Sequence, residues 1–250
     1  MITKLRSPGC LFALLLSILW LTGCARSYTT PSGRADLTDI TSSTMRESFA
    51  AKPAAVLPAN IAAVRVQTTG YSSYRTRDQG GVYGGGRYSV LTVREVEDEA
   101  DLKRITELPD VAGLTGVGRL LLPEALNTDV QLREGAARVK ADMLLIYTFE
   151  TTFHQNDEST ALKIITLGWS PTRKVSVYVT VSALLMDVRT GFIYGTLEAT
   201  EKRALSTTAW DSEEAMDRAR QEAETAGFKA LVREFEKAWP SFAKRAKLGA

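Results

Sequence analysis

The stretch Val175-Ser-Val-Tyr-Val-Thr-Val-Ser-Ala-Leu-Leu185 decides the fold of this 250-residue chain. Apolar residues occupy every second position along it, and serine, tyrosine and threonine fill the positions between the first five. Because successive side chains of a strand point to opposite faces, this alternation predicts a strand with one buried face. The stretch ends at Asp187-Val-Arg-Thr-Gly191, where Gly191 can adopt the positive φ of a short hairpin turn. We therefore expect residues 192–201 to return as its antiparallel partner.

Three segments before this hairpin also have the character of strands. The apolar run Ile61–Gln67 follows Pro58 and suits a buried strand. The segment Ser89–Val96 alternates in the manner of a strand, and Met143–Phe149 is a strong apolar strand candidate. The sheet is therefore expected to draw strands from most of the chain.

Two helices are predicted between these strands from their start signals. An acidic run from Glu97 to Asp101 precedes apolar residues at helical spacing up to Leu108, and negative charge is favourable at the start of a helix. Thr128 and Gln131 have the form of a capping box, which should open a helix that ends near Val139.

The last predicted element is a helix from about Ser212 to Trp239. Asp211 and Glu214 have capping-box spacing at its start, and alanines recur along one face, which allows close approach to a sheet. Pro240 is expected to stop it. The fold class is therefore α/β or α+β, a single mixed sheet with an antiparallel hairpin, covered by helices and ending in a long C-terminal helix.

Residues 1–23 have the pattern of a lipoprotein signal peptide. A basic start is followed by an apolar run that ends in the box Leu21-Thr22-Gly23-Cys24. In bacterial lipoproteins the cysteine of such a box is acylated, so we expect the mature chain to begin at Cys24 and to be held at a lipid bilayer. The alternative, a membrane-spanning anchor, needs ~20 apolar residues, and this run is too short. Ala25, in place of an aspartate that resembles an inner-membrane retention signal, favours the outer membrane, and we expect the protein at its periplasmic face.

The rest of the chain divides by composition. Residues 24–58 are rich in serine, threonine, alanine and proline, which predicts a flexible tether. Residues 59–240 are expected to form one periplasmic α/β domain, and residues 241–250 a C-terminal tail.

The mature chain would be electrically neutral and free of usable thiols. It keeps 29 of the 31 basic residues and all 29 acidic residues, so a nucleic-acid partner is not expected. Cys10 leaves with the signal peptide and Cys24 carries the lipid, which excludes disulfides and cysteine-based metal sites. His154 is the single histidine, and we interpret it as an exposed loop residue. No metal and no cofactor are predicted.

Residues 70–88 form a glycine-rich segment that contains four of the eight tyrosines. We interpret it as a long mobile loop, and the combination of tyrosine and arginine suits a contact surface for protein or glycan. Tyr83 and Arg87 are the expected anchors, although a surface loop without a partner has the same composition. The glycines lack the Gly-Lys-Ser/Thr ending of a phosphate loop. The candidate binding residues are Tyr71, Tyr74, Arg75, Arg77, Tyr83, Arg87 and Tyr88.

The chain resembles a group of periplasmic lipoproteins in the order of its elements. The resemblance rests on the strand Ile61–Gln67, the helix and strand within Gln131–Tyr147, and the hairpin Val175–Glu198. This group includes the curli-secretion lipoprotein, the activators of penicillin-binding proteins and the amino-terminal domain of the Tol-system propeller protein. The stretches Arg119–Arg133 and Asp187–Gly195 also look like an uncharacterised family of bacterial lipoproteins. Both resemblances imply an envelope location. Neither includes a catalytic signature.

Three functions follow as hypotheses. The first is a membrane-anchored, non-enzymatic protein that binds an envelope protein or a cell-wall component. The second is a subunit of an outer-membrane secretion or assembly complex. The third is a glycan hydrolase in which Glu150 pairs with an acid of residues 95–101. A lipase-like or penicillin-binding-type enzyme is disfavoured, because the nucleophile motifs G-x-S-x-G and S-x-x-K are absent from the sequence.

Overall fold

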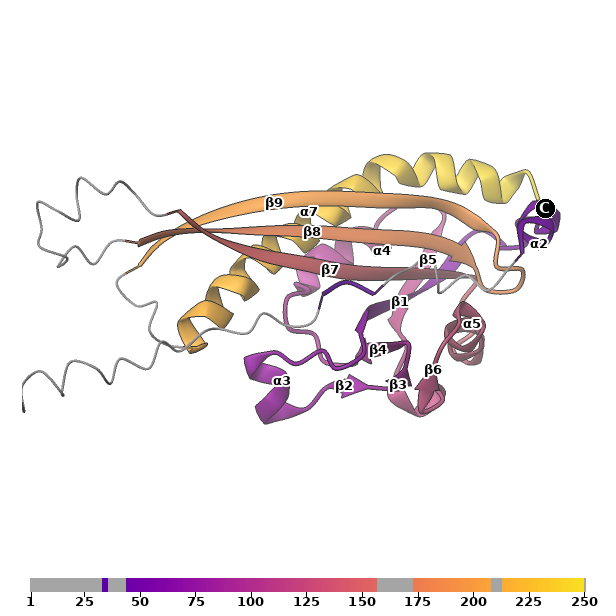
Figure 1. Ribbon diagram of the computed structural model, residues 1–250. Coiled ribbons are helices and arrows are strands. Elements are labelled where there is room, and N and C mark those ends of the chain that lie inside the picture. The colour runs from indigo at the N-terminus through magenta and orange to yellow at the C-terminus, as the bar shows by residue number, and fades with distance from the viewer. Residues whose placement is uncertain (1–32, 36–43, 157–172, 208–212, 250) are drawn as a thin grey trace, which may run out of the picture.

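The predicted hairpin strand is the middle strand of a long three-stranded layer. In the computed structural model, β8 (Arg173–Asp187) pairs antiparallel with β7 (Met143–Asn156) on one side and with β9 (Ile193–Thr207) on the other. Figure 1 shows these strands running side by side along much of the molecule. The predicted turn is confirmed, because Gly191 has a φ of 72° and its N–H donates to the Asp187 carbonyl at 3.0 Å.

The structure describes residues 33–35, 44–156, 173–207 and 213–249. The predicted signal peptide of residues 1–23, the predicted acylation site Cys24 and the predicted capping residue Asp211 lie outside the described residues. Within the described part of the chain, no helix is both long enough and apolar enough to cross a membrane.

β1 (Ala59–Thr68) joins the three-stranded layer to the rest of a mixed, seven-stranded sheet. Residues Ile61–Val64 pair in parallel with Met143–Ile146 of β7, and the opposite edge of β1 carries two more strands. The sheet order is β2-β4-β1-β7-β8-β9, with β5 also paired to β1, and β3 pairs with β6 in a separate two-stranded sheet. The smaller strands are β2 (Val82–Tyr83), β3 (Gly85–Gly86), β4 (Tyr88–Leu91), β5 (Val111–Gly116) and β6 (Ala125–Leu126).

Helices cover both faces of this sheet (Figure 1). The protein therefore has two hydrophobic cores, one on each face of the sheet. In β7, Leu145 and Phe149 belong to the core beneath α7, whereas Leu144 and Ile146 belong to the core beside α5. Alternate residues of a strand face opposite ways, so one apolar run supplies both cores. The described helices are α2 (Met45–Ala50), α3 (Tyr74–Gln79), α4 (Glu99–Thr106), η1 (Arg119–Leu121), a 3-10 helix, α5 (Asp129–Arg138) and α7 (Glu213–Lys247).

The helix starts predicted from the acidic run and the capping box are confirmed. Asp98 caps α4 by accepting the backbone N–H of Ala100 at 2.9 Å. At the start of α5, the carbonyl oxygen of the Gln131 side chain accepts the N–H of Thr128, as a capping box requires. The predicted fold class is therefore confirmed in its α+β form.

The predicted strand Ser89–Val96 is wrong beyond Leu91. β4 ends there, where the backbone N–H of Thr92 donates to the carbonyl of Gly81, the residue just before β2. The chain then turns so that the carboxyl groups of Glu95 and Glu97 enter the protein interior. The alternating pattern predicted a strand with an exposed polar face, whereas these two acidic side chains are buried and paired with arginines.

The prediction that Pro240 ends the last helix is also wrong. α7 contains Pro240 and continues to Lys247, so the expected tail at residues 241–250 is mostly helix. Proline inside a helix costs about 3 kcal/mol, but the turns beyond it bury Phe242 and Ala246. Phe242 packs so closely on β9 that a Cβ placed at Gly195 would lie 2.5 Å from its ring. The burial of this last part of α7 offsets the cost of the proline.

Residues assigned to a free tether contact the domain earlier than predicted. The hydroxyl of Thr68 donates to the Gly33 carbonyl at 3.0 Å, and the N–H of Ala35 donates to Oγ1 of Thr148 at 3.0 Å. Farther along, the N–H of Ala54 donates to Oδ2 of Asp187 at 2.7 Å. The tether of residues 24–58 is therefore docked at Gly33 and again just before β1.

Candidate binding site

Two arginine side chains lie buried between the sheet and α7. Arg65 comes from β1 and is 2% exposed, whereas Arg220 comes from the first part of α7 and is fully buried. Oε2 of Glu224 bridges them, at 3.1 Å from Nη2 of Arg65 and 2.6 Å from Nη1 of Arg220. Charges removed from water are costly unless they are paired in this way.

Three more carboxyl groups complete this cluster. Asp217 accepts from Nε of Arg220 at 2.9 Å, and Glu95 accepts from Nη2 of the same arginine at 3.1 Å. Glu97 lies 3.7 Å from Nη1 of Arg65 and accepts the hydroxyl of Tyr147 at 3.0 Å. The cluster ties the segment after β4 to α7. We call it the buried ion network, which consists of Arg65, Glu95, Glu97, Asp217, Arg220 and Glu224.

Aromatic rings complete the surroundings of Arg65. Its guanidinium carbon lies 4.3 Å from the ring centre of Phe149 and 5.6 Å from that of Tyr71, within cation–π range. Its Nε and Nη1 have no hydrogen-bond partner within the described part of the chain. Burial alone would lower the pKa of Arg65, but Tyr71 and the neighbouring carboxylates raise it above its ordinary value. The side chain therefore stays charged.

Tyr71 is part of this interior, which corrects its assignment to an exposed binding loop. It is 4% exposed, and its hydroxyl accepts from Nη2 of Arg65 at 3.2 Å and from Nη1 of Arg220 at 3.4 Å. Burial raises the pKa of Tyr71 to about 12, against the opposing effect of Arg65. The phenol is thus a neutral partner for both arginines.

The rest of residues 70–88 is ordered rather than a long loop. Ser73 and Thr76 form a capping box at the start of α3, and short strands follow it. The glycines serve tight corners: Gly86 has a φ of 103°, and a Cβ there would lie 2.7 Å from the Leu126 carbonyl oxygen. We predicted a mobile loop from the glycine content, but here glycine allows the backbone of β3 to pack closely against that of β6.

Four of the predicted binding residues lie away from the pocket described next. Tyr88 is 1% exposed and its hydroxyl donates to the Thr128 carbonyl, so its assignment to a contact surface is wrong. The Tyr83 hydroxyl donates to the Leu122 carbonyl at 3.1 Å, in a half-buried position. Two exposed arginines complete this set: Arg77, which pairs with Glu213, and Arg87.

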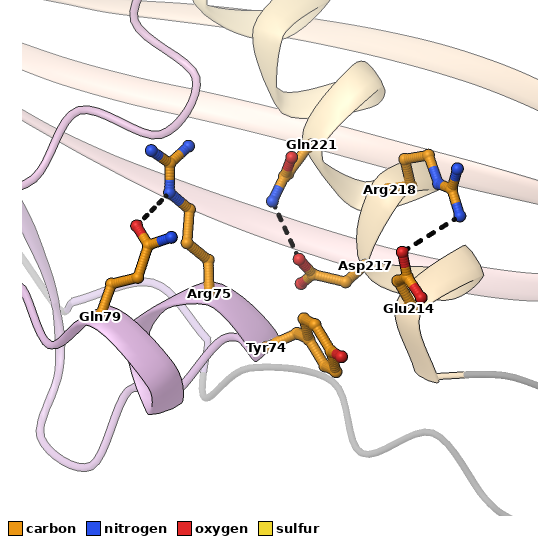
Figure 2. A pocket seen from close by; sticks show the side chains of 7 residues that line it. All are labelled: Tyr74, Arg75, Gln79, Glu214, Asp217, Arg218 and Gln221. Atoms are coloured by element: carbon orange, nitrogen blue, oxygen red, sulfur yellow. Dashed lines mark hydrogen bonds and ion pairs between the residues drawn. The ribbon is translucent and has the colours of Figure 1, made fainter.

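α3 and the first turns of α7 enclose a pocket of about 390 Å³. Figure 2 shows side chains from the two helices converging on it. Asp217 connects the pocket to the buried ion network, because Oδ1 accepts from Arg220 while Oδ2 accepts from Nε2 of Gln221 at 2.9 Å. This wall of the pocket is therefore fixed by the core. The lining residues are Tyr74, Arg75, Gln79, Glu214, Asp217, Arg218 and Gln221.

The rim of the pocket is more exposed than this wall. Arg218 and Glu214 form an ion pair at 3.6 Å, with each side chain about two-thirds exposed (65% and 64%). Arg75 donates from Nε to Oε1 of Gln79 at 3.0 Å. Among the described side chains, no carboxylate lies within ion-pair distance of Arg75. Its two Nη groups are thus able to donate to an acceptor that a ligand would bring.

Two of the predicted binding residues, Tyr74 and Arg75, belong to this pocket. The α7 residues opposite them were not singled out from the sequence. A signal was present, because Asp217, Arg220 and Glu224 are charged residues on the alanine-rich face of the predicted helix. Charge on a buried face indicates pairing inside the protein.

The predicted carboxylate pair for glycan hydrolysis is not formed. Glu150 on β7 is half-exposed and lies 3.6 Å from Nε of Arg34, on the face of the sheet away from α7. Glu95 and Glu97 bind arginines on the α7 face, so the sheet separates them from Glu150. His154 is exposed as predicted, but it lies on β7, where its ring centre is 5.1 Å from that of Tyr178.

Comparisons with known proteins find no matching family model and no matching curated protein. This chain is similar to several solved structures, including the following two. Protein XCC0632 from Xanthomonas campestris, described with the family model DUF330, is 12% identical with a TM-score of 0.34, and the match covers 86% of this chain and 99% of that chain. The hypothetical protein CT253 from Chlamydia trachomatis is 9% identical with a TM-score of 0.27, covering 71% and 95% respectively. Both scores are too low to carry an argument about fold or function.

Proposed function

We propose that this chain is a lipid-anchored envelope protein whose domain binds another envelope component in the pocket between α3 and α7. The observation that carries the binding role is the contrast between the two walls of the pocket. Asp217 is fixed by Arg220 and Gln221, whereas Arg75 on the opposite wall has no carboxylate partner among the described residues. A preorganised wall facing an available cation is typical of a binding site.

The chemistry of the pocket favours a polar ligand with a negatively charged group. Arg75 would donate to a carboxylate or phosphate, and Gln79 and Gln221 add amide groups close by. Tyr74 offers a broad ring that is only partly exposed. An acidic side chain of an envelope protein or a carboxylate of a cell-wall component fits this description.

The membrane location rests on the box Leu21-Thr22-Gly23-Cys24. Gly33, the first described residue that contacts the domain, lies nine positions after Cys24. Fully extended, nine residues span about 30 Å. An acylated Cys24 would therefore keep the domain close to the bilayer surface.

Fractionation of cells tests the anchor. The variant Cys24→Ala should lose incorporation of radioactive palmitate and leave the membrane fraction, whereas Cys10→Ala should retain both because Cys10 lies in the segment that is removed. If Cys24→Ala stays in the membrane fraction, the chain is held by an uncleaved anchor or by another route, and the proposal fails.

Site-specific crosslinking tests the pocket. A photoreactive amino acid at Gln79 should capture a partner in cells, and the same group at the exposed Val130 on α5 should not. Arg75→Gln should lower the yield about tenfold, the loss expected for a charge-assisted hydrogen bond. Arg87→Gln is the matched control, because it removes an exposed arginine outside the pocket. Equal yields from Arg75→Gln and Arg87→Gln would refute the pocket as the binding site.

A further inference from the structure

α2 presents apolar side chains to solvent on the segment that leads to the domain. Met45 is 77% exposed and Phe49 is 87% exposed, and no residue of α2 is buried. Residues four apart lie on the same side of a helix, so the two side chains share one face. This face has no partner among the described residues.

Local capping, rather than packing, holds α2 in place. The N–H of Thr44 donates to Oε2 of Glu47 at 2.7 Å, and the N–H of Glu47 donates to Oγ1 of Thr44 at 3.4 Å. The N–H of Ala51 then donates to the Glu47 carbonyl at 2.8 Å. A helix this short gains little from its own backbone hydrogen bonds, so a capped helix that buries nothing on the domain is suited to a surface elsewhere.

The C-terminal end of α7 extends this surface. Figure 1 shows α2 beside that end, and a Cβ placed at Gly249 would lie 2.2 Å from the Pro53 carbonyl oxygen, so the residues that follow α2 touch those that follow α7. Leu248 is 78% exposed there. Arg46 and Lys52 are exposed on and just after α2, whereas Lys247 pairs with Asp110 at 2.8 Å. We call the whole surface the apolar–basic patch, which consists of Met45, Arg46, Phe49, Lys52 and Leu248.

We propose that the apolar–basic patch lies against the bilayer, with its apolar side chains among the lipid headgroups and its cations facing anionic phospholipid. Apolar side chains beside lysine and arginine are the composition of interfacial membrane surfaces. This inference rests on the proposed lipid anchor, which brings the patch to the bilayer. Met45 is 21 residues from Cys24, so the anchor holds it at high local concentration and a weak contact suffices.

Vesicle binding of the unacylated chain tests this contact separately from the anchor. The chain from residue 24 with Cys24→Ser has no other thiol, so a single cysteine at Phe49 can carry an environment-sensitive fluorophore. Vesicles that contain anionic phosphatidylglycerol should shift its emission to the blue, and added salt should reduce the shift. The matched control is a cysteine at Leu120 on η1, which is 90% exposed and far from α2 in the sequence.

The double variant Met45→Asp/Phe49→Asp should lower the fraction bound to these vesicles about tenfold, because it removes both apolar side chains, whereas Leu120→Asp should leave it nearly unchanged. Circular dichroism should show an unchanged fold, since neither residue is buried. No shift at position 49, or an equal shift at 120, overturns the proposal. A shift that appears without vesicles and grows with protein concentration shows a second copy as the occupant and also overturns it. None of these results depends on acylation.

Discussion

At the scale of single residues, Arg220 is the side chain whose burial is hardest to predict from the sequence. It is fully buried, and its guanidinium contacts Glu95, Asp217 and Glu224 from three directions. The burial of a charge is tolerated only when its partners remain in place. Arg220 therefore holds the segment after β4, the start of α7 and the fixed wall of the pocket together.

Replacing this residue should be severe. Arg220→Met should lower the free energy of unfolding by about 3–5 kcal/mol, because it removes the cation that pairs with the buried Glu95 and Asp217 and leaves Glu224 paired with Arg65 alone. Urea denaturation followed by circular dichroism measures the change. Arg218→Met is the control, since its ion pair with Glu214 is exposed and the expected change is within about 0.5 kcal/mol. Equal effects of the two substitutions would contradict the structural role given to the buried ion network.

At the scale of elements, α7 shows why a local stop signal can fail. A prediction from the proline alone considers only the lost backbone hydrogen bond and the clash of the ring with the preceding turn. Phe242 and Ala246, beyond Pro240, are buried against the rest of the domain. The segment 241–247 therefore belongs to the core rather than to a tail.

A pair of neighbouring substitutions tests this extension. Phe242→Ala should lower the free energy of unfolding by about 3–5 kcal/mol, the usual cost of removing a buried phenylalanine ring. Ser241→Ala, at the exposed neighbouring position, should change it by less than about 0.5 kcal/mol. If both variants are as stable as the parent chain, the helix does not pack beyond Pro240. Thermal unfolding in the absence of ligand provides the measurement.

Much of the element order was predictable because it depends on local signals. The alternation that starts at Val175, the turn at Gly191 and the capping box at Thr128 all involve residues close together in the sequence. The site was predictable only in part. Arg75 stood out by composition, but Asp217 lies 142 positions away, and only the folded chain brings α3 and α7 together. Tyr71 was misplaced for a similar reason, since its arginine partners lie on β1 and on α7.

At the scale of the whole molecule, buried tyrosines make stability depend on alkaline pH. Burial raises the pKa of Tyr71 to about 12, and it also raises the pKa of three other tyrosines above the ordinary value of 10.0. Carboxyl groups nearby add to the effect, through Glu97 beside Tyr147 and Asp187 beside Tyr194. These phenols come from the segment after β1 and from β4, β7 and β9, so they sample both cores of the domain.

The sign of the effect follows from proton binding. Between pH 10 and 12 the unfolded chain loses phenolic protons that the folded chain keeps, so the free energy of unfolding falls as pH rises. The stabilisation from Tyr71 is complete below pH 10 and is lost as pH approaches 12; at about 1.4 kcal/mol per pH unit, it amounts to roughly 2–3 kcal/mol. The variant Tyr71→Phe should show a shallower alkaline decline. Tyrosinate absorbance and circular dichroism, recorded together, should show the buried phenols ionising only as the helices unfold. Ionisation of every tyrosine in one step near pH 10, with the circular dichroism unchanged, would contradict the burial that the structure assigns to them.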